Sequence, residues 1–345
     1  MTKSSGSFFT SLLSIFSSLF GKKPANTTPA QPAPVPDSAD EPSPLTTSKV
    51  LVLVYDPTME DGQKLSKKMG WKAAEQIATE YMGDILQTSV GTARYQIAQR
   101  IDIDEFPAKV GGARYTPETY MKVLRGEMSP LTPAEADMNA ILTRFNILPK
   151  IARSEIDEVW IFAFPQAGFY ESTMGGVGAF WCNAPIIKGP AETCPRRFVV
   201  MGFNYERGVG EMLESFGHRA ESIMEKTFEK LVGSTNLWRR FIRYEKSAPG
   251  HAACGNIHFA PNSERDYDWN NPSPVQSECD DWLKNFPNFK GGGFVRTVTA
   301  AEWGSGDIRL HHQWWLKHFP HVAGRQNGIH NNWWQYMLDP NKVKI

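Results

Sequence analysis

Continuous apolar runs bounded by polar or turn residues predict buried strands at three places in the chain. KVLVLVY, EVWIFAF and RFVVMGF are short runs rich in β-branched and aromatic residues, and they cover residues 49–55, 158–164 and 197–203. Such runs favour strands over buried helices. Residues 94–103 alternate polar and apolar side chains, which predicts a half-exposed strand. The Gly-rich residues 174–181 predict a further strand with a bulge or a close backbone approach.

Apolar residues at helical spacing predict three long helical regions between and after these strands. They cover residues 62–89, residues 117–148 with breaks at two prolines, and residues 207–231. Alternating strands and helices predict an α/β (α+β) fold with a mixed sheet and long helices. After residue 232 the pattern changes to loops and short helices rich in Trp, His, Asn and Gly, which predicts an irregular C-terminal subdomain.

The N-terminal segment differs from the rest of the chain. Within residues 8–20, Phe, Leu and Ile fall on one side of a helix and Ser and Thr on the other. The stretch is too short to span a bilayer. It can dock on a partner as a targeting tag, lie on a membrane surface, or form a secretory h-region, although Lys22 and Lys23 are the wrong flank for the last. We expect an exported or secreted protein.

The predicted organisation has four parts. Seven prolines among Ala, Ser and Thr follow the tag and indicate a semi-extended, disordered linker. The parts are an amphipathic tag at 1–21, the linker at 22–48, an α/β subdomain at 49–232 and a Trp/His-rich subdomain at 233–345.

Composition and charge exclude some functions. The chain has 37 basic and 37 acidic residues, so no excess of positive charge indicates a nucleic-acid partner. No run of 18 apolar residues predicts a transmembrane helix. The pairs Cys182–Cys194 and Cys254–Cys279 each flank a polar loop, and such local disulfides favour export. The alternative is four buried thiols.

The helix at 207–231 carries the candidate chemistry. Glu214 and His218 are four residues apart, so both side chains can reach one ion from adjacent turns. One carboxylate and one imidazole suit zinc, and manganese is the second choice. Glu211 and Glu221 lie near the same face as candidate general bases or supports for the histidine. The alternative is a solvated helix face with a simple i,i+4 pair.

Further ligands are expected after residue 232. His251 and His258 flank Cys254 closely enough to complete a zinc site, although hydrogen-bonding loop histidines are the alternative. Asp266 and Asp268 lie among aromatic residues, as glycosidase carboxylates or calcium ligands can.

Residues 49–230 resemble the N-terminal subdomain of zincin metallopeptidases in their order of strands and helices. The segment LESFGH, residues 213–218, resembles the L-H-E-F-G-H form of the family's H-E-x-x-H helix. The resemblance makes His218 the second metal-binding histidine and puts Glu214 in the place of the first. Ser215 stands where the family has its catalytic glutamate, which leaves Glu211 or Glu221 as substitutes. In zincins an edge strand, here 175–181, pairs with an extended peptide substrate.

Two functions follow from these patterns. The first is a metal-dependent, peptidase-like hydrolase delivered through its N-terminal tag. The second is a non-catalytic effector that recognises a partner or glycan through its Trp/His/Asn-rich end. The chain also resembles uncharacterised bacterial proteins that share Y-E-R-G, here residues 205–208, and H-H-x-W-W, here residues 311–315.

Overall fold

The computed structural model describes residues 36–38, 43–289 and 294–345 of the chain. The predicted tag at 1–21 and most of the predicted linker at 22–48 lie outside these residues. The described residues belong to one compact unit, Pro34–Ile345. No helix among them has the length and apolarity to cross a membrane.

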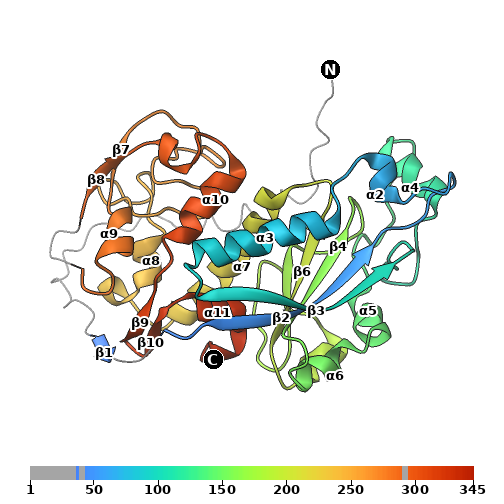
Figure 1. Cartoon of the computed structure of the whole chain (residues 1–345), viewed down its shortest axis with the longest axis horizontal. Helices are drawn as coiled ribbons and strands as arrows, with labels where there is room; N and C mark the ends of the chain where they lie inside the picture. The colour runs from blue at the N-terminus through green and yellow to red at the C-terminus, as the bar shows by residue number, and fades with distance from the viewer. Residues whose placement is uncertain (1–35, 39–42, 290–293) are drawn as a thin grey trace. The chain divides into compact units, whose positions relative to one another are not determined.

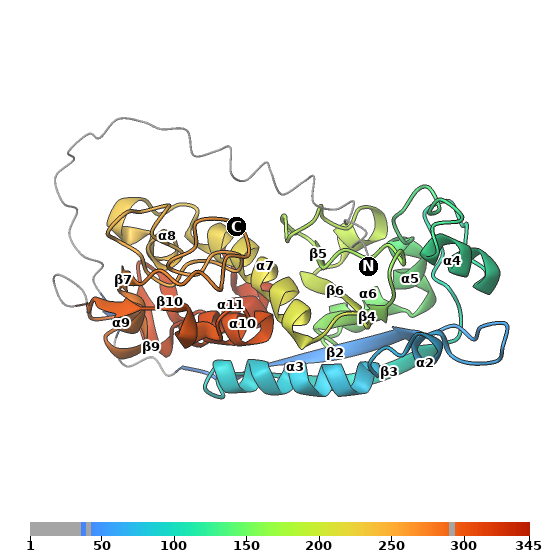
Figure 2. The ribbon, with the colours of Figure 1, turned by 90° about the horizontal axis from the view of Figure 1, so that it is seen from above.

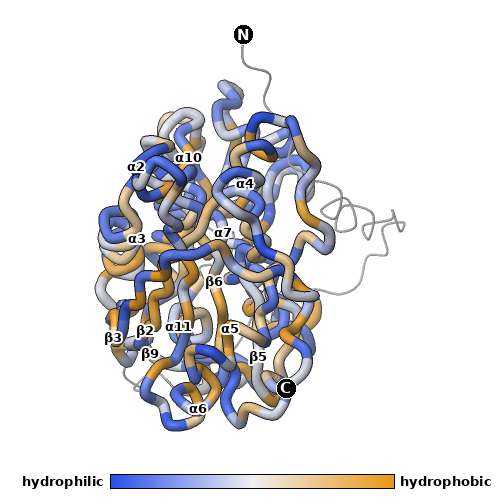
Figure 3. The backbone as a smooth tube through the Cα atoms, turned by 90° about the vertical axis from the view of Figure 1, so that its right-hand side faces the viewer, coloured by the Kyte–Doolittle hydropathy of each residue, from blue (hydrophilic) through white to orange (hydrophobic). Residues whose placement is uncertain are grey.

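A five-stranded mixed sheet forms the centre of the molecule and confirms the predicted α/β class (Figure 1). Its order is β3-β2-β4-β6-β5; β3, β2, β4 and β6 are parallel, and β5 is antiparallel to β6. The bounds are β2 Thr46–Tyr55, β3 Ala93–Ile103, β4 Glu158–Ala163, β5 Ser172–Gly175 and β6 Phe198–Asn204. The three apolar runs are therefore buried strands, as predicted. Figure 3 shows β2 and β6 as largely hydrophobic segments.

Two helices, α3 (Ala74–Thr88) and α7 (Val209–Phe228), cover one face of this sheet. Tyr81 of α3 lies at the centre of the packing, with its ring centroid 5.3 Å from that of Trp160 and 6.4 Å from that of Phe216 on α7. Helices α5 (Met138–Arg144) and α6 (Ile147–Ala152) lie on the other face (Figure 1). Both faces are covered, so the central strands are apolar on both sides.

Two predicted helices are broken in the structure. The region 62–89 divides into α2 (Leu65–Met69) and α3, because Gly70 ends α2 in the left-handed conformation with φ +68°. The region 117–148 divides into α4 (Pro117–Leu124), α5 and the start of α6. Apolar periodicity predicts one helix in each region because the apolar positions of the separate helices face the same core.

The prediction of a strand at 174–181 is wrong beyond residue 175. Only the first two of these residues belong to β5, and the chain turns at Gly176 with φ +102°, where a Cβ would lie 2.2 Å from the Arg196 carbonyl oxygen. The outer edge of β5 is covered by the following loop: Ile187 N donates to Met174 O at 2.9 Å and Thr173 Oγ1 to Pro185 O at 2.7 Å. The edge expected at 175–181 is therefore not a free strand.

The C-terminal part consists of short elements around an aromatic core. Its elements are α8 (Leu237–Phe241), α9 (Cys279–Lys284), α10 (Ile308–Lys317), α11 (Trp334–Leu338), the pair β7 (Val275–Ser277) and β8 (Arg296–Val298), and the three-stranded sheet β1 (Pro36–Ser38), β9 (His321–Gln326) and β10 (Ile329–Asn332). Helical 3-10 turns occur at Gly189–Thr193, Gly233–Thr235, Ala300–Trp303 and Pro340–Lys342. Figure 2 shows α10 and α11 beside α7. Contacts across residue 232 thus place the two predicted subdomains in one unit.

Candidate metal centre

Helix α7 begins with a cap and is then buried on most sides. Glu211 Oε2 accepts a hydrogen bond from Gly208 N at 2.9 Å, which caps the helix. The apolar face packs on the sheet, as predicted. The opposite, polar face is also covered, because Glu214 and His218 are buried at 7% and 8% exposure. The solvated face that was the alternative interpretation is therefore not what the structure has.

Three side chains converge on this covered face. Glu214 Oε1 and His218 Nε2 are 3.9 Å apart, and His258 Nε2 lies 3.1 Å from each of them. Bond lengths of about 2.0–2.2 Å in tetrahedral geometry place zinc ligands about 3.2–3.6 Å from one another. The distances of 3.1 Å and 3.9 Å lie just outside this range on either side, so small shifts of the side chains would bring the three atoms to the spacing of one zinc ion.

Each histidine is held through its other ring nitrogen. Glu221 Oε2 is 3.2 Å from His218 Nδ1, and Asp266 Oδ1 is 2.9 Å from His258 Nδ1. Carboxylates in these positions fix the tautomer that presents Nε2 to an ion. The second oxygen of Glu221 accepts a hydrogen bond from Ile257 N at 3.2 Å, so the same side chain also fastens the loop that carries His258.

Tyr267 completes the group. Its hydroxyl lies 2.7 Å from Glu214 Oε1 and 3.0 Å from His258 Nε2. Tyr267 is 48% exposed and has φ +56°, a left-handed conformation that is uncommon for a bulky residue. Strained backbone of this kind is concentrated at functional sites. The exposed tyrosine marks the side on which the site approaches solvent.

The charges of the site support one another. Burial raises the pKa of Glu214, but hydrogen bonds from His258 and Tyr267 outweigh it and the net pKa is lowered. Burial lowers the pKa of His258, yet Asp266 and Glu214 raise it to about 10. The pKa of His218 is raised because the bond to Glu221 outweighs burial. A cation between these groups, whether protons or a metal ion, is therefore stabilised.

The structure places the remaining predicted site residues elsewhere or in another role. His251 is exposed and is not part of the converging group. Glu211 caps the helix through Oε2, and Glu221 contacts His218 Nδ1 and Ile257 N with its two oxygens, which is the supporting role expected as the alternative to a general base. Asp266 supports His258, whereas Asp268 stays in its own loop and accepts from Asn271 Nδ2 at 3.0 Å.

The predicted disulfides do not form: all four cysteines are buried free thiols. Cys182 Sγ contacts Ser172 Oγ at 3.7 Å, while Cys194 Sγ points to Leu148 O at 3.9 Å, so these two thiols have different neighbours. Burial raises the pKa of Cys182 and of Cys279 to about 11, which keeps them protonated. Cys254 packs inside the core and is not a ligand of the converging group.

Most tryptophans of the C-terminal part belong to a buried core. Trp282 and Trp333 pack edge to face on Phe241, with ring centroids 5.1 Å and 5.5 Å from its own, and Trp238 stacks on the same ring at 5.8 Å. Trp315 and Trp333 are at most 1% exposed. A side chain buried in this way offers no face to a sugar ring, so the structure gives no support to recognition through these residues.

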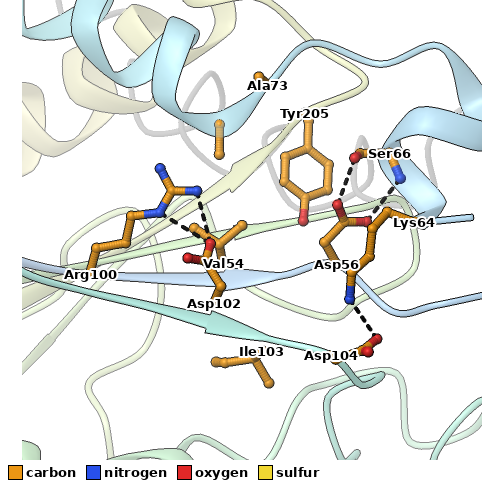
Figure 4. A pocket seen from close by; sticks show the side chains of 11 residues that line it. Val54, Asp56, Lys64, Ser66, Ala73, Arg100, Asp102, Ile103, Asp104 and Tyr205 are labelled. Atoms are coloured by element: carbon orange, nitrogen blue, oxygen red, sulfur yellow. Dashed lines mark hydrogen bonds and ion pairs between the residues drawn. The ribbon is translucent and has the colours of Figure 1, made fainter.

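A second cluster of possible metal ligands and one cavity in the described part of the chain have charged side chains that are already engaged in ion pairs. Cys279, Asp280 and His318 lie close together, but Asp280 pairs with Lys284 at 2.6 Å and with Arg296 at 2.9 Å. A cavity of about 280 Å³ lies at the carboxyl ends of β2 and β3 (Figure 4). Four of its charged residues pair with one another, since Lys64 contacts Asp104 and Arg100 contacts Asp102, both at 2.8 Å. Asp56 accepts a hydrogen bond from Ser66 Oγ at 2.6 Å.

Sequence reasoning missed Tyr267 and the support that Asp266 gives to His258. The motif D-Y-D-W at residues 266–269 indicates carboxylates among aromatic residues, but no local pattern indicates that this segment folds back onto α7. Comparison of the chain with protein-family models, with curated proteins and with solved structures finds no match in any of the three.

Proposed function

We propose that the chain is a metal-dependent hydrolase whose zinc ion is held by Glu214, His218 and His258. The observation that carries the proposal is the convergence of three ligand atoms whose two histidines are each held by a carboxylate. Two nitrogens and one oxygen suit zinc better than manganese, which prefers oxygen ligands.

The ligand number favours catalysis over a structural role. Structural zinc sites are closed by four protein ligands, whereas catalytic sites have three and keep one position for water or substrate. Zinc in such a site lowers the pKa of its bound water and polarises a carbonyl group. The Tyr267 hydroxyl donates to Glu214 Oε1 at 2.7 Å and so holds this carboxylate ligand in place beside the ion.

The substrate class that we propose is hydrolysable esters and amides. Binding of a peptide as an added strand on β5 has no support, because the loop at 182–187 occupies that edge. The site approaches solvent at Tyr267 and Asp266, and we infer that the substrate enters from this loop.

The first test is metal content. The full chain, purified without chelator or metal affinity resin, should contain about one zinc per chain by elemental analysis. His218→Ala and His258→Ala should lose it. His251→Ala is the matched control, because His251 is an exposed histidine seven residues from His258, and it should keep the metal.

Hydrolysis is tested next with a panel of peptides, esters and phosphoesters. Activity that is removed by chelator, restored by zinc and absent in His218→Ala supports the proposal. A folded wild-type chain that binds no zinc when zinc is supplied contradicts it. Bound zinc without hydrolysis of any substrate class would support the second function, a non-catalytic effector.

A further inference from the structure

His312 of α10 is a buried histidine with one nitrogen left over. It is 0% exposed, and its Nδ1 contacts the carbonyl oxygen of Ile308 in the preceding turn. A carbonyl oxygen can only accept, so Nδ1 carries the proton and Nε2 presents a bare lone pair. Among the described residues Nε2 has no hydrogen-bond partner. Buried polar atoms in this state call for an explanation, such as an ion or water.

The packing of α10 against α7 places His312 beside the candidate metal centre. A Cβ on Gly210 would lie 2.5 Å from Ile308 Cγ2, so α10 touches α7 one turn before Glu214. His312 follows Ile308 by one turn. The Trp269 ring joins the two regions, with its centroid 5.1 Å from that of His312 and 5.2 Å from that of Tyr267.

The electrostatics agree with this placement. The pKa of His312 lies well below its usual value, first because of burial and then because of His311, His218 and His258. Charges on both histidine ligands therefore act on the His312 ring. The ring stays neutral, so its Nε2 accepts hydrogen bonds and does not donate them.

Distance decides what His312 can contact. The ligand atoms of Glu214, His218 and His258 all lie within 4.8 Å of one another, and His312 is not in that group. Two ligands of one zinc ion are at most about 4 Å apart, so His312 is too far away to be a fourth ligand in this arrangement. A water about 2 Å from the ion, with a hydrogen bond of about 2.8 Å, extends the reach of the ion to about 4.8 Å.

We propose that His312 Nε2 accepts a hydrogen bond from a water bound to the ion at Glu214, His218 and His258. It thereby holds the water in place, a task for which Ser215 offers no carboxylate and has its hydroxyl bound to the Glu211 carbonyl oxygen at 3.0 Å. This inference rests on the proposed metal site and adds the residue that orients the nucleophile.

The test uses the full chain loaded with Co²⁺, whose visible spectrum reports the ligands of the ion. His312→Phe keeps the volume of the ring and removes the lone pair, whereas His312→Gln keeps an acceptor. His318→Phe is the matched control, because His318 is also buried in α10 and its Nδ1 lies 2.7 Å from the Trp314 carbonyl oxygen.

We expect wild type, His312→Gln and His318→Phe to bind one Co²⁺ with similar spectra and similar pH transitions. His312→Phe should also bind one Co²⁺, but the transition that reports loss of a water proton should rise by about one pH unit. If His312→Phe does not fold, His312→Ala under the same titration replaces it.

Two results overturn the inference and differ in meaning. A wild-type chain that binds no Co²⁺ removes the proposed metal site and this assignment with it. A wild-type chain that binds Co²⁺, with a His312→Phe or His312→Ala transition equal to its own, leaves the metal site standing and removes only the role of His312.

Discussion

Two carboxylates act on the candidate centre without touching the ligand position. Glu221 and Asp266 each contact the Nδ1 atom of one histidine, at 3.2 Å and 2.9 Å. They differ in exposure, since the Asp266 side chain is 53% exposed and that of Glu221 only 28%. Asp266 is therefore the residue at which support of a ligand can be tested without disturbing the core.

Asp266→Asn should weaken zinc binding by about 10- to 100-fold, because a carboxylate behind a metal-binding histidine fixes its orientation and raises its basicity. The measurement is competition with a chelator of known affinity. Glu264→Gln is the control, since it removes the same charge from the same exposed loop. Equal affinities for the two variants would show that Asp266 acts only through net charge.

At the scale of elements, the contact of α7 with the loop that precedes His258 determines the site. Gly217 lies between the two ligands in the sequence of α7 and packs on the residue before His258: a Cβ on it would lie 2.2 Å from Ile257 Cδ1. The glycine therefore lets the loop approach the helix closely enough for His258 to reach Glu214 and His218. Close packing therefore explains the glycine in the Phe-Gly-His end of the segment 213–218.

Gly217→Ala should keep a folded chain but displace Ile257 and, with it, His258. Alanine favours the helix by about 1 kcal/mol over glycine, so a loss of metal affinity would not come from a weaker helix. We expect zinc affinity to fall at least tenfold in chelator competition. Gly83→Ala in α3, where a Cβ meets no atom within 4 Å, is the control and should bind zinc as wild type does.

A buried ion pair fastens α7 to the sheet. Arg219 and Glu158 of β4 are 2.6 Å apart, and their side chains are 0% and 1% exposed. Arg219 also donates to the Met337 carbonyl oxygen of α11, and Glu158 Oε1 accepts from Trp160 Nε1 at 2.7 Å. The pair therefore joins α7, which carries the site, to β4 and α11.

Arg219→Met should destabilise the protein by about 3–5 kcal/mol, because it leaves the Glu158 carboxylate buried without its partner. Urea unfolding measures the change. The double variant Arg219→Met/Glu158→Gln removes the uncompensated charge and should recover part of the loss. No recovery in the double variant would mean that the arginine contributes through packing alone.

At the scale of the whole molecule, buried neutral histidines couple stability to acidity. Burial lowers the pKa of His311 to about 3 and that of His318 to about 4, and it lowers the pKa of His312 as well. In the unfolded chain these groups titrate at their ordinary value of 6.5. Below that value the unfolded state binds protons that the native state does not, so stability falls as pH falls.

Each of these histidines should lower the free energy of unfolding by up to about 1.4 kcal/mol per pH unit between about pH 6.5 and its native pKa. Urea unfolding from about pH 7 to about pH 5 measures the slope. His318→Gln should flatten it by about one proton, since Asp280 and Lys317 near His318 stay in place. An unchanged slope would show that His318 is not neutral in the native state.

Local patterns predicted the parts of this protein that depend on near neighbours in the chain. The apolar runs at 49–55, 158–164 and 197–203 form strands because they are short and rich in β-branched and aromatic residues, and a sheet covered on both faces buries every side chain of such a run. The four-residue spacing of Glu214 and His218 brings both onto one helix face, whatever surrounds the helix.

Only the tertiary structure decided which distant residues meet that face. His251 precedes Cys254 by three residues and His258 follows it by four, so both are candidates in the sequence. Only His258 reaches α7, because Ile257 packs closely on Gly217 there. The turn at Gly176, the covered edge of β5 and the buried tryptophans also depend on contacts between distant segments. Periodicity reports which face of an element is apolar, whereas packing between elements decides what covers the polar face, and at α7 that cover supplies the third ligand.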